Sequence, residues 1–130
     1  MKRLRRKKIV FGGFTLLEMI CVISIIGILT TLAVPQITKY IDKANETKII
    51  SAVTELNNTA ILMQAENKSK LEISEIIKEV GSENLGVNMQ VGSSSFKVGK
   101  FVGTFNLENE KVVANVTEPQ ATKYTLNGKL

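Results

Sequence analysis

One carboxylate in this sequence lies at the start of an apolar stretch, where a negative charge is energetically unfavourable. Glu18 follows Phe14 by four positions and is followed by an uncharged, mostly apolar stretch, residues 19–38. A carboxylate placed in apolar surroundings destabilises a protein unless it is paired with a cation or protonated. Glu18 is therefore expected to pair with a cation or to be protonated.

The residue types that carry most enzyme chemistry are absent or scattered. The 130 residues include no histidine and one cysteine, Cys21. These counts exclude a Cys/His metal cluster, a Ser-His-Asp triad and an internal disulfide. Three glutamates near the carboxyl end, Glu108, Glu110 and Glu118, indicate a solvated face and not a calcium site. We predict a protein that is not an enzyme and that binds no cofactor or metal, with Cys21 as a small packing residue.

The positive charge of the chain is concentrated at one end. The net charge is +5, from 17 basic and 12 acidic side chains, and six of the basic residues lie in the first eight positions. The chain after Gly13 keeps 11 basic and 12 acidic side chains. A basic protein can bind nucleic acid, but here the charge belongs to a leader. Nucleic acid is therefore not an expected partner of the remainder.

The uncharged stretch is long enough to cross a membrane. As a helix, residues 19–38 would extend ~30 Å, which is about the thickness of the hydrocarbon core of a bilayer. The basic run on its amino side favours a cytoplasmic amino terminus and places later residues outside. A removable secretory signal is the alternative, but Glu18 and the lack of a small-x-small cleavage pattern fit it poorly.

A helical pattern continues beyond the membrane candidate. Apolar residues recur at helical spacing over residues 36–67, and Pro35 can kink a helix without ending it. The pattern predicts one helix from Phe14 to about Asn67, of ~80 Å. Its apolar positions are Ile37, Tyr40, Ile41 and Ala44, followed by Ile49, Val53, Leu56, Ala60 and Met63.

The second half of the chain changes period. Ser69 and Glu72 have the spacing of a capping box for a short helix that Gly81 ends in a left-handed conformation. Alternating patterns then predict strands at 87–91, 96–98, 101–107, 111–116 and 122–126. Residues 92–94 and 108–110 are predicted turns, and Pro119 an edge or a break. Together these patterns predict an α+β fold in which a long amino-terminal helix packs on a small antiparallel sheet.

The order of features around residues 13–35 resembles that of type IV prepilins and of the related pseudopilins. The basic leader ends at Gly12 and Gly13, Phe14 follows, Glu18 comes four positions later, and an apolar run extends to Pro35. The resemblance covers about 22 residues closely, and the later part of the chain agrees with it only in architecture. It implies a pilin-like fold and a protein that is assembled into filaments.

The resemblance implies that a prepilin peptidase cuts between Gly13 and Phe14 and that the new amino group of Phe14 is N-methylated. Glycine before the cut suits this role because no side chain obstructs a close approach of the backbone. It also implies a partner for Glu18, the charged amino terminus of Phe14 on a neighbouring subunit, which would set the axial register. The alternative for Glu18 is a shallow position that reaches the lipid headgroups.

Two further residues have implied roles in the filament. Gly27 and Pro35 bracket a segment whose helical hydrogen bonding they weaken, and in pili resembling this one that segment unwinds. Ordinary membrane glycine and proline are the alternative. Many Gram-negative pilins also close a loop near the carboxyl end with a disulfide. This chain lacks the cysteine pair, so the anchor of its carboxyl-terminal segment is left open.

These observations predict four segments: a basic leader at 1–13, a membrane and filament-core helix at 14–35, its amphipathic continuation at 36–67 and a globular head at 68–130. The expected function is that of a structural subunit in a type IV pilus-like filament. The subunit waits in the cytoplasmic membrane, with its amino terminus in the cytoplasm, and reaches the cell surface on assembly.

The expected partners are other copies of the chain, minor pilins, the prepilin peptidase and N-methyltransferase, the assembly platform and membrane lipids. The first alternative is a pseudopilin of a competence or type II secretion system, which would not form long external fibres. The second is a monomeric, membrane-anchored binding module with its ligand site on the sheet and an uncut amino terminus. A DNA-binding protein is the third.

Overall fold

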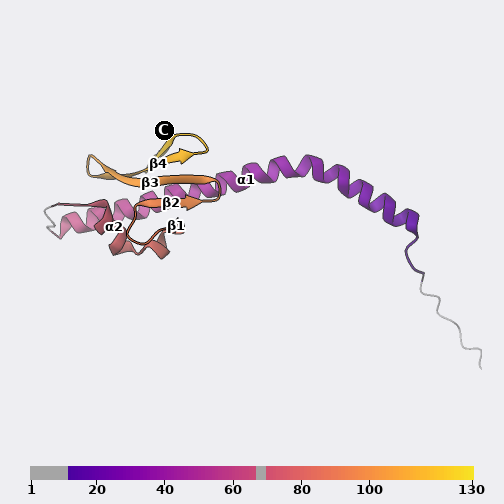
Figure 1. Cartoon of the computed structure of the whole chain (residues 1–130), viewed down its shortest axis with the longest axis horizontal. Coiled ribbons are helices and arrows are strands. Elements are labelled where there is room, and N and C mark those ends of the chain that lie inside the picture. Colours follow the sequence, from indigo (N-terminus) through magenta and orange to yellow (C-terminus); the bar gives the residue numbers. More distant parts are fainter. Residues whose placement is uncertain (1–11, 67–69) are drawn as a thin grey trace, which may run out of the picture. The chain divides into compact units, whose positions relative to one another are not determined.

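The fold is that of a computed structural model that describes residues 12–66 and 70–130. It contains a 50-residue helix, α1 (Leu16–Ala65), followed by α2 (Ile73–Val80) and a short 3-10 helix, η1 (Ser82–Leu85). The strands are β1 (Asn88–Met89), β2 (Ser95–Val98), β3 (Phe101–Glu108), β4 (Lys111–Glu118), β5 (Thr122–Thr125) and β6 (Gly128–Lys129) (Figure 1). The predicted α+β class is confirmed, with a long apolar amino-terminal helix and an antiparallel sheet.

The chain divides into two compact units within α1. The first ends at Ile37, and the second is Thr38–Leu130. Every described residue of the first unit is exposed. The second unit has its own core, so each is described by itself. The four segments predicted from the sequence stay a prediction, because the leader and the 67/68 boundary fall on residues outside the described ranges.

The sheet of the second unit is an antiparallel meander. Over residues 70–130, the part of this unit that follows α1, six strands lie in chain order from β1 to β6. The connection between β3 and β4 is a two-residue turn, with Glu108 paired to Lys111 and with positive φ at both Asn109 and Glu110. Two successive residues with positive φ make the turn whose twist suits a hairpin. The turn predicted at 108–110 is confirmed.

The core lies between the carboxyl-terminal half of α1, called the outer half below, and the face of the sheet that packs on it (Figure 1). Ile49, Val53 and Leu56 of α1 are fully buried. From the sheet, the rings of Phe96 and Phe105 stack with centroids 4.5 Å apart. The predicted apolar positions from Ile49 to Met63 are therefore confirmed as core.

A buried amide fixes the position of α1 against β4. The side chain of Asn57 donates to the carbonyls of Val53 and Val112 and accepts from the amide of Val112, with all three distances 2.9 Å. Asn57 thus completes the backbone hydrogen bonding of one residue of β4, as a neighbouring strand would. A buried polar group that is fully paired in this way specifies one register of helix against sheet.

Among the apolar positions of the predicted amphipathic segment, Ile37, Tyr40, Ile41 and Ala44 are exposed, and the buried residues of α1 begin at Ile49. Other local predictions were wrong. The strand at 87–91 is limited to β1, and Val91 is 98% exposed. The hairpin of β5 and β6 was not predicted in full, since β6 was missed.

The predicted capping box of α2 is also wrong. Ser69 lies outside the described residues, and the helix begins at Ile73 with Glu72 as its N-cap, in extended conformation and without a side-chain cap. Gly81 does end the helix at positive φ, but its ψ of 123° lies outside the left-handed helical region.

Candidate functional site

The functional candidates from the sequence lie at the start of α1, in the first unit. Gly12, Gly13 and Phe14 precede the helix in non-helical conformation and are exposed. A Cβ atom built on Gly12 or Gly13 would meet nothing within 4 Å. The chain's own packing therefore does not require glycine at either position. Whatever requires glycine there has to come from another molecule.

Thr15 and Glu18 form a reciprocal capping box at the start of α1. The Thr15 carbonyl accepts the first helical hydrogen bond, from the Met19 amide, at 3.2 Å. The Glu18 amide donates to the Thr15 hydroxyl at 3.1 Å, and the Thr15 amide donates to Glu18 Oε2 at 3.2 Å. This geometry pairs two amides that would otherwise lack partners at the helix start.

The capping box determines the electrostatic surroundings of the Glu18 carboxylate. Its carboxylate lies at the helix amino terminus, where the helix dipole favours negative charge. One carboxylate oxygen accepts from Thr15, and the other keeps its full capacity to accept from a cation. Sequence analysis missed this role, although the signal, Thr at one position and Glu three later, is present. The pairing of Glu18 with a neighbouring Phe14 stays a prediction.

The hydroxyl groups of the membrane candidate are paired within the helix. Ser24 donates to the carbonyl of Ile20, Thr30 to that of Ile26 and Thr31 to that of Ile28, each at 2.7 Å. Side chains that bond back in this way present little polarity to lipid. Polar side chains within this run are therefore compatible with a hydrocarbon environment.

Gly27 and Pro35 both lie inside α1, which stays helical through them. A Cβ on Gly27 would meet nothing within 4 Å, and Pro35 has no amide hydrogen for the carbonyl of Thr31. Unwinding of the segment between them in a filament stays a prediction. Cys21 is exposed and not in a disulfide.

α1 contains a stretch long and apolar enough to cross a membrane, and none of that stretch is buried within the chain. Its large side chains, among them Ile23, Ile28 and Leu32, are 64%, 66% and 74% exposed. A contiguous apolar surface of this size marks contact with lipid or with protein. These residues need partners that the described chain does not provide.

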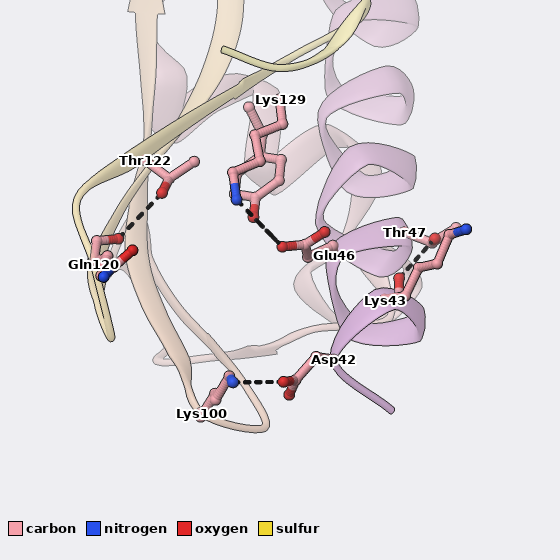
Figure 2. A network of polar contacts seen from close by, with 9 residues as sticks. Asp42, Lys43, Glu46, Thr47, Lys100, Gln120, Thr122 and Lys129 are labelled. Atoms are coloured by element: carbon pink, nitrogen blue, oxygen red, sulfur yellow. Dashed lines mark hydrogen bonds and ion pairs between the residues drawn. The ribbon is translucent and has the colours of Figure 1, made fainter. Parts of the chain in front are cut away.

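The question of what anchors the carboxyl-terminal segment is answered in the second unit by a helix–sheet clamp, defined as Asp42, Glu46, Lys100, Tyr124 and Lys129. Lys100 of the β2–β3 turn pairs with Asp42 of α1 at 2.5 Å (Figure 2). Glu46 accepts from the Tyr124 hydroxyl at 3.0 Å and pairs with Lys129 of β6 at 3.7 Å. The last strands are thereby tied to α1 without a disulfide.

Burial, the hydrogen bond to Glu46 and the charge of that carboxylate, in decreasing order of effect, together raise the pKa of the Tyr124 phenol to about 12. On the outer face, the hydrogen bond from Lys123 lowers the pKa of Glu108. These shifts belong to groups that hold elements together. Among the described residues, no group of three His, Cys, Asp or Glu side chains could hold a metal ion.

An open groove of about 660 Å³ lies beside α2. Ile73 and Ile77 line one side, and Val91 of the loop between β1 and β2 lines the other. The binding module considered as an alternative would have its ligand site on the sheet. This groove lies at the edge of the fold instead, and nothing in the structure shows what would cover it.

The comparisons with known proteins match the start of the chain. Residues 11–34 match the family described as the prokaryotic N-terminal methylation motif. Type II secretion system core protein G of Aeromonas hydrophila is 40% identical over 56 residues, which are 43% of this chain and 39% of that protein. A fimbrial protein of Pseudomonas aeruginosa is 42% identical over 48 residues, which are 37% of this chain and 31% of that protein.

A third relative is core protein G of Escherichia coli strain K12, 40% identical over 55 residues, which are 42% of this chain and 38% of that protein. The chain thus covers about two fifths or less of the length of these curated relatives. No solved structure matches it with comparable significance. Over its first part, this chain carries the prokaryotic N-terminal methylation motif and is related to fimbrial proteins and to type II secretion system core protein G.

Proposed function

We propose that this chain is a structural subunit of a type IV pilus-like filament and that filament assembly, not catalysis, is its activity. One observation carries the proposal. The segment that matches the methylation motif includes the part of α1 whose apolar side chains are not buried in the described chain. A bundle of such helices from many copies would bury those side chains.

The proposed sequence of events begins in the cytoplasmic membrane. The basic leader holds the amino terminus in the cytoplasm, a peptidase cuts between Gly13 and Phe14, and the new amino group is methylated. Extraction into the filament then exchanges lipid contacts of α1 for contacts with neighbouring helices. Glu18, already held at the helix start by Thr15, would pair with the amino terminus of Phe14 on a neighbour. The further partners are minor pilins and the assembly platform.

A pseudopilin of a type II secretion or competence system is the second candidate, because relatives named core protein G match the same segment at 40% identity. Both candidates share the fold, the cut and the membrane helix. They differ in whether long fibres leave the cell.

Purified surface filaments from the native host test the proposal. We expect this chain as their main subunit, with its amino terminus at Phe14. Filaments that persist when the gene is deleted would contradict a role as the main pilin. Normal secretion lost in that deletion, without any external fibres in the parent strain, would favour the pseudopilin.

A further inference from the structure

The second unit has a basic end at the start of its own part of α1. Its lysines come from two regions: Lys39 and Lys43 of α1 are exposed, and so are Lys97 of β2 and Lys100 of the β2–β3 turn. We call the surface formed by these four lysines and Tyr40 the basal patch. Lys100 lies beside Asp42 (Figure 2), which brings the β2–β3 turn to the first turns of the helix in this unit.

The turn is held close to the helix by its backbone. Gly99 has a φ of +57°, and a Cβ at that position would collide with the side-chain nitrogen of Asn45. Glycine therefore allows the β2–β3 turn to approach α1 without a side chain between them. The four lysines thus lie at the same end of the unit.

Acidic groups nearby only partly balance the lysines. Asp42 is paired with Lys100, and Glu46 with Lys129 and Tyr124. Glu118 lies across from Val102 near the same end. With Lys129 included, this end of the unit carries five basic and three acidic side chains, so its net charge is positive. Among the described residues, the ion pairs are those of Lys70, Lys100, Lys123 and Lys129, and none involves Lys39 or Lys43.

Chain continuity fixes the distance from the basal patch to the membrane. The uncharged run ends at Thr38, and Asp42 follows four residues later, ~6 Å along a helix axis. The headgroup layer outside the hydrocarbon core is itself roughly 5–7 Å thick. Under the proposed membrane insertion, Asp42 and its partner Lys100 would therefore lie at headgroup depth.

Exposed apolar residues support the same depth. Tyr40 and Ile41 are 67% and 54% exposed and are not part of the core. Tyrosine beside lysine is the combination enriched at membrane interfaces, because the ring enters the headgroup layer and the ammonium binds phosphate. In water these exposed side chains would have no comparable partner.

We propose that, before assembly, the basal patch binds the headgroups of anionic phospholipids and holds the second unit against the membrane surface. The proposal rests on the membrane insertion included in the proposed function. Breaking these contacts would then be one of the costs of extracting the subunit. Lysines near an anionic surface contribute additively to binding and act over about a Debye length.

The test uses single tryptophan reporters, since the chain contains no tryptophan. Gln120, exposed and beside Lys100 and Asp42, is replaced by Trp as the near reporter. Val91, in the loop at the opposite end of β2, is replaced by Trp as the far reporter. The full chain is placed in vesicles of phosphatidylcholine with phosphatidylglycerol, and a nitroxide attached to lipid headgroups serves as quencher. Flotation of the vesicles reports separately whether the chain is inserted.

We expect stronger quenching of Gln120→Trp than of Val91→Trp. The difference should be largely lost in vesicles of phosphatidylcholine alone. It should also be lost when Lys39 and Lys43 are both changed to Gln, and should persist when Lys78 and Lys111 are changed instead, which removes the same charge elsewhere.

Each other outcome contradicts the proposal in a distinct way. Equal quenching of the two reporters in floated vesicles would overturn the basal patch and leave the proposed function intact. Quenching that does not depend on Lys39 and Lys43 would show that the span alone sets the depth. A chain that does not float would overturn both proposals. Protection of Gln120→Trp only in assembled filaments would assign the patch to a second copy of the chain.

Discussion

The two halves of α1 are parts of one continuous helix, yet only one of them has buried side chains. From Leu16 to Ile37 no residue is buried, whereas seven are buried between Ile49 and Met63. The outer half finds its partners in the same chain, on β3, β4 and α2. The large apolar side chains of the amino half are exposed. The stability of the fold therefore depends on the outer half, and under the proposed function assembly depends on the amino half.

Polar groups differ between the halves in the same way. Asn57 in the outer half bonds across to Val112 of β4, so its role is to join two elements. Ser24 and Thr30 in the amino half bond only to carbonyls of their own helix in the described structure. Glu18 is the exception in that half, because its charge is not neutralised by Thr15. A partner from another molecule is most useful there.

The largest expected effect is on processing. Gly13→Leu should leave an uncut precursor in the membrane, because the added side chain would obstruct the peptidase. The substitution should not disturb the chain itself, since the space around Gly13 is open. Immunoblots of membranes from the native host measure the size of the protein. Gly27→Leu, at an equally open position inside α1, is the control and should be cut. Normal trimming of Gly13→Leu would remove the assigned cleavage site.

The next effect is on assembly. Glu18→Ala, as the only copy of the subunit, should be cut but should form few or no filaments. Without Glu18, the charged amino terminus of a neighbouring Phe14 would be buried without a partner. Such a charge costs on the order of 3–5 kcal/mol, enough to disfavour a misplaced subunit by a factor of hundreds. Electron microscopy of sheared filaments provides the count.

Thr15→Ala separates pairing between subunits from capping within one. It removes the hydroxyl that caps Glu18 and keeps the carboxylate, and a lost N-cap costs about 1 kcal/mol. We expect reduced but regular filaments. If Thr15→Ala assembles as poorly as Glu18→Ala, the capping box and not the charge pair is what assembly requires. Abundant filaments from Glu18→Ala would instead support the alternative in which Glu18 reaches the lipid headgroups.

A matched pair of truncations tests the division of α1 directly. Leu56→Ala should destabilise the folded second unit by about 2–5 kcal/mol, as expected for a fully buried leucine. Leu29→Ala, at a site 59% exposed, should change the unfolding free energy by less than about 0.5 kcal/mol. Denaturant titration of the full chain in detergent, followed by circular dichroism, measures both. Equal losses of stability would show that the amino half contributes to the fold.

The smallest effect concerns the helix–sheet clamp. Tyr124→Phe should cost about 1 kcal/mol at neutral pH, through the lost hydrogen bond to Glu46. Because the folded pKa of Tyr124 is raised from 10.0 to about 12, its contribution is complete below the unfolded pKa and disappears as pH rises through the folded one. Stability of the parent should therefore fall between those values, and the Phe variant should lack that part of the fall.

Tyr40→Phe is the control for this measurement, since Tyr40 is 67% exposed. It should leave stability unchanged at each pH. A pH dependence that is identical in the parent and in Tyr124→Phe would contradict the role of the clamp.

The sequence was most informative where one physical cause dominates. The helical repeat of apolar residues from Ile49 to Met63 predicted the core face, because burial against a sheet requires that spacing. The same repeat around Ile37 and Tyr40 gives an apolar face that is exposed in the structure. Periodicity identifies an apolar face but not what covers it, and the sheet reaches α1 only from about Asp42 onward.

Short capping motifs were less reliable. A hydroxyl residue followed three positions later by glutamate occurs at Thr15 and at Ser69. It forms the capping box at Thr15, where the interpretation of Glu18 had centred on charge. At the second place, α2 begins at Ile73, because its buried residues Ile76 and Ile77 set where the helix packs. The missed strand β6 did have a local signal, Asn127 followed by Gly128, a pair favoured in hairpins.

The central claim is that the chain enters a filament through α1 after being cut before Phe14. The most direct measurement is the intact mass of this protein in filaments purified from its native host. The account predicts a single species that begins at Phe14 and carries one additional methyl group. A full-length chain with residues 1–13 still attached, or a cut chain found only in the membrane and never in filaments, would contradict it.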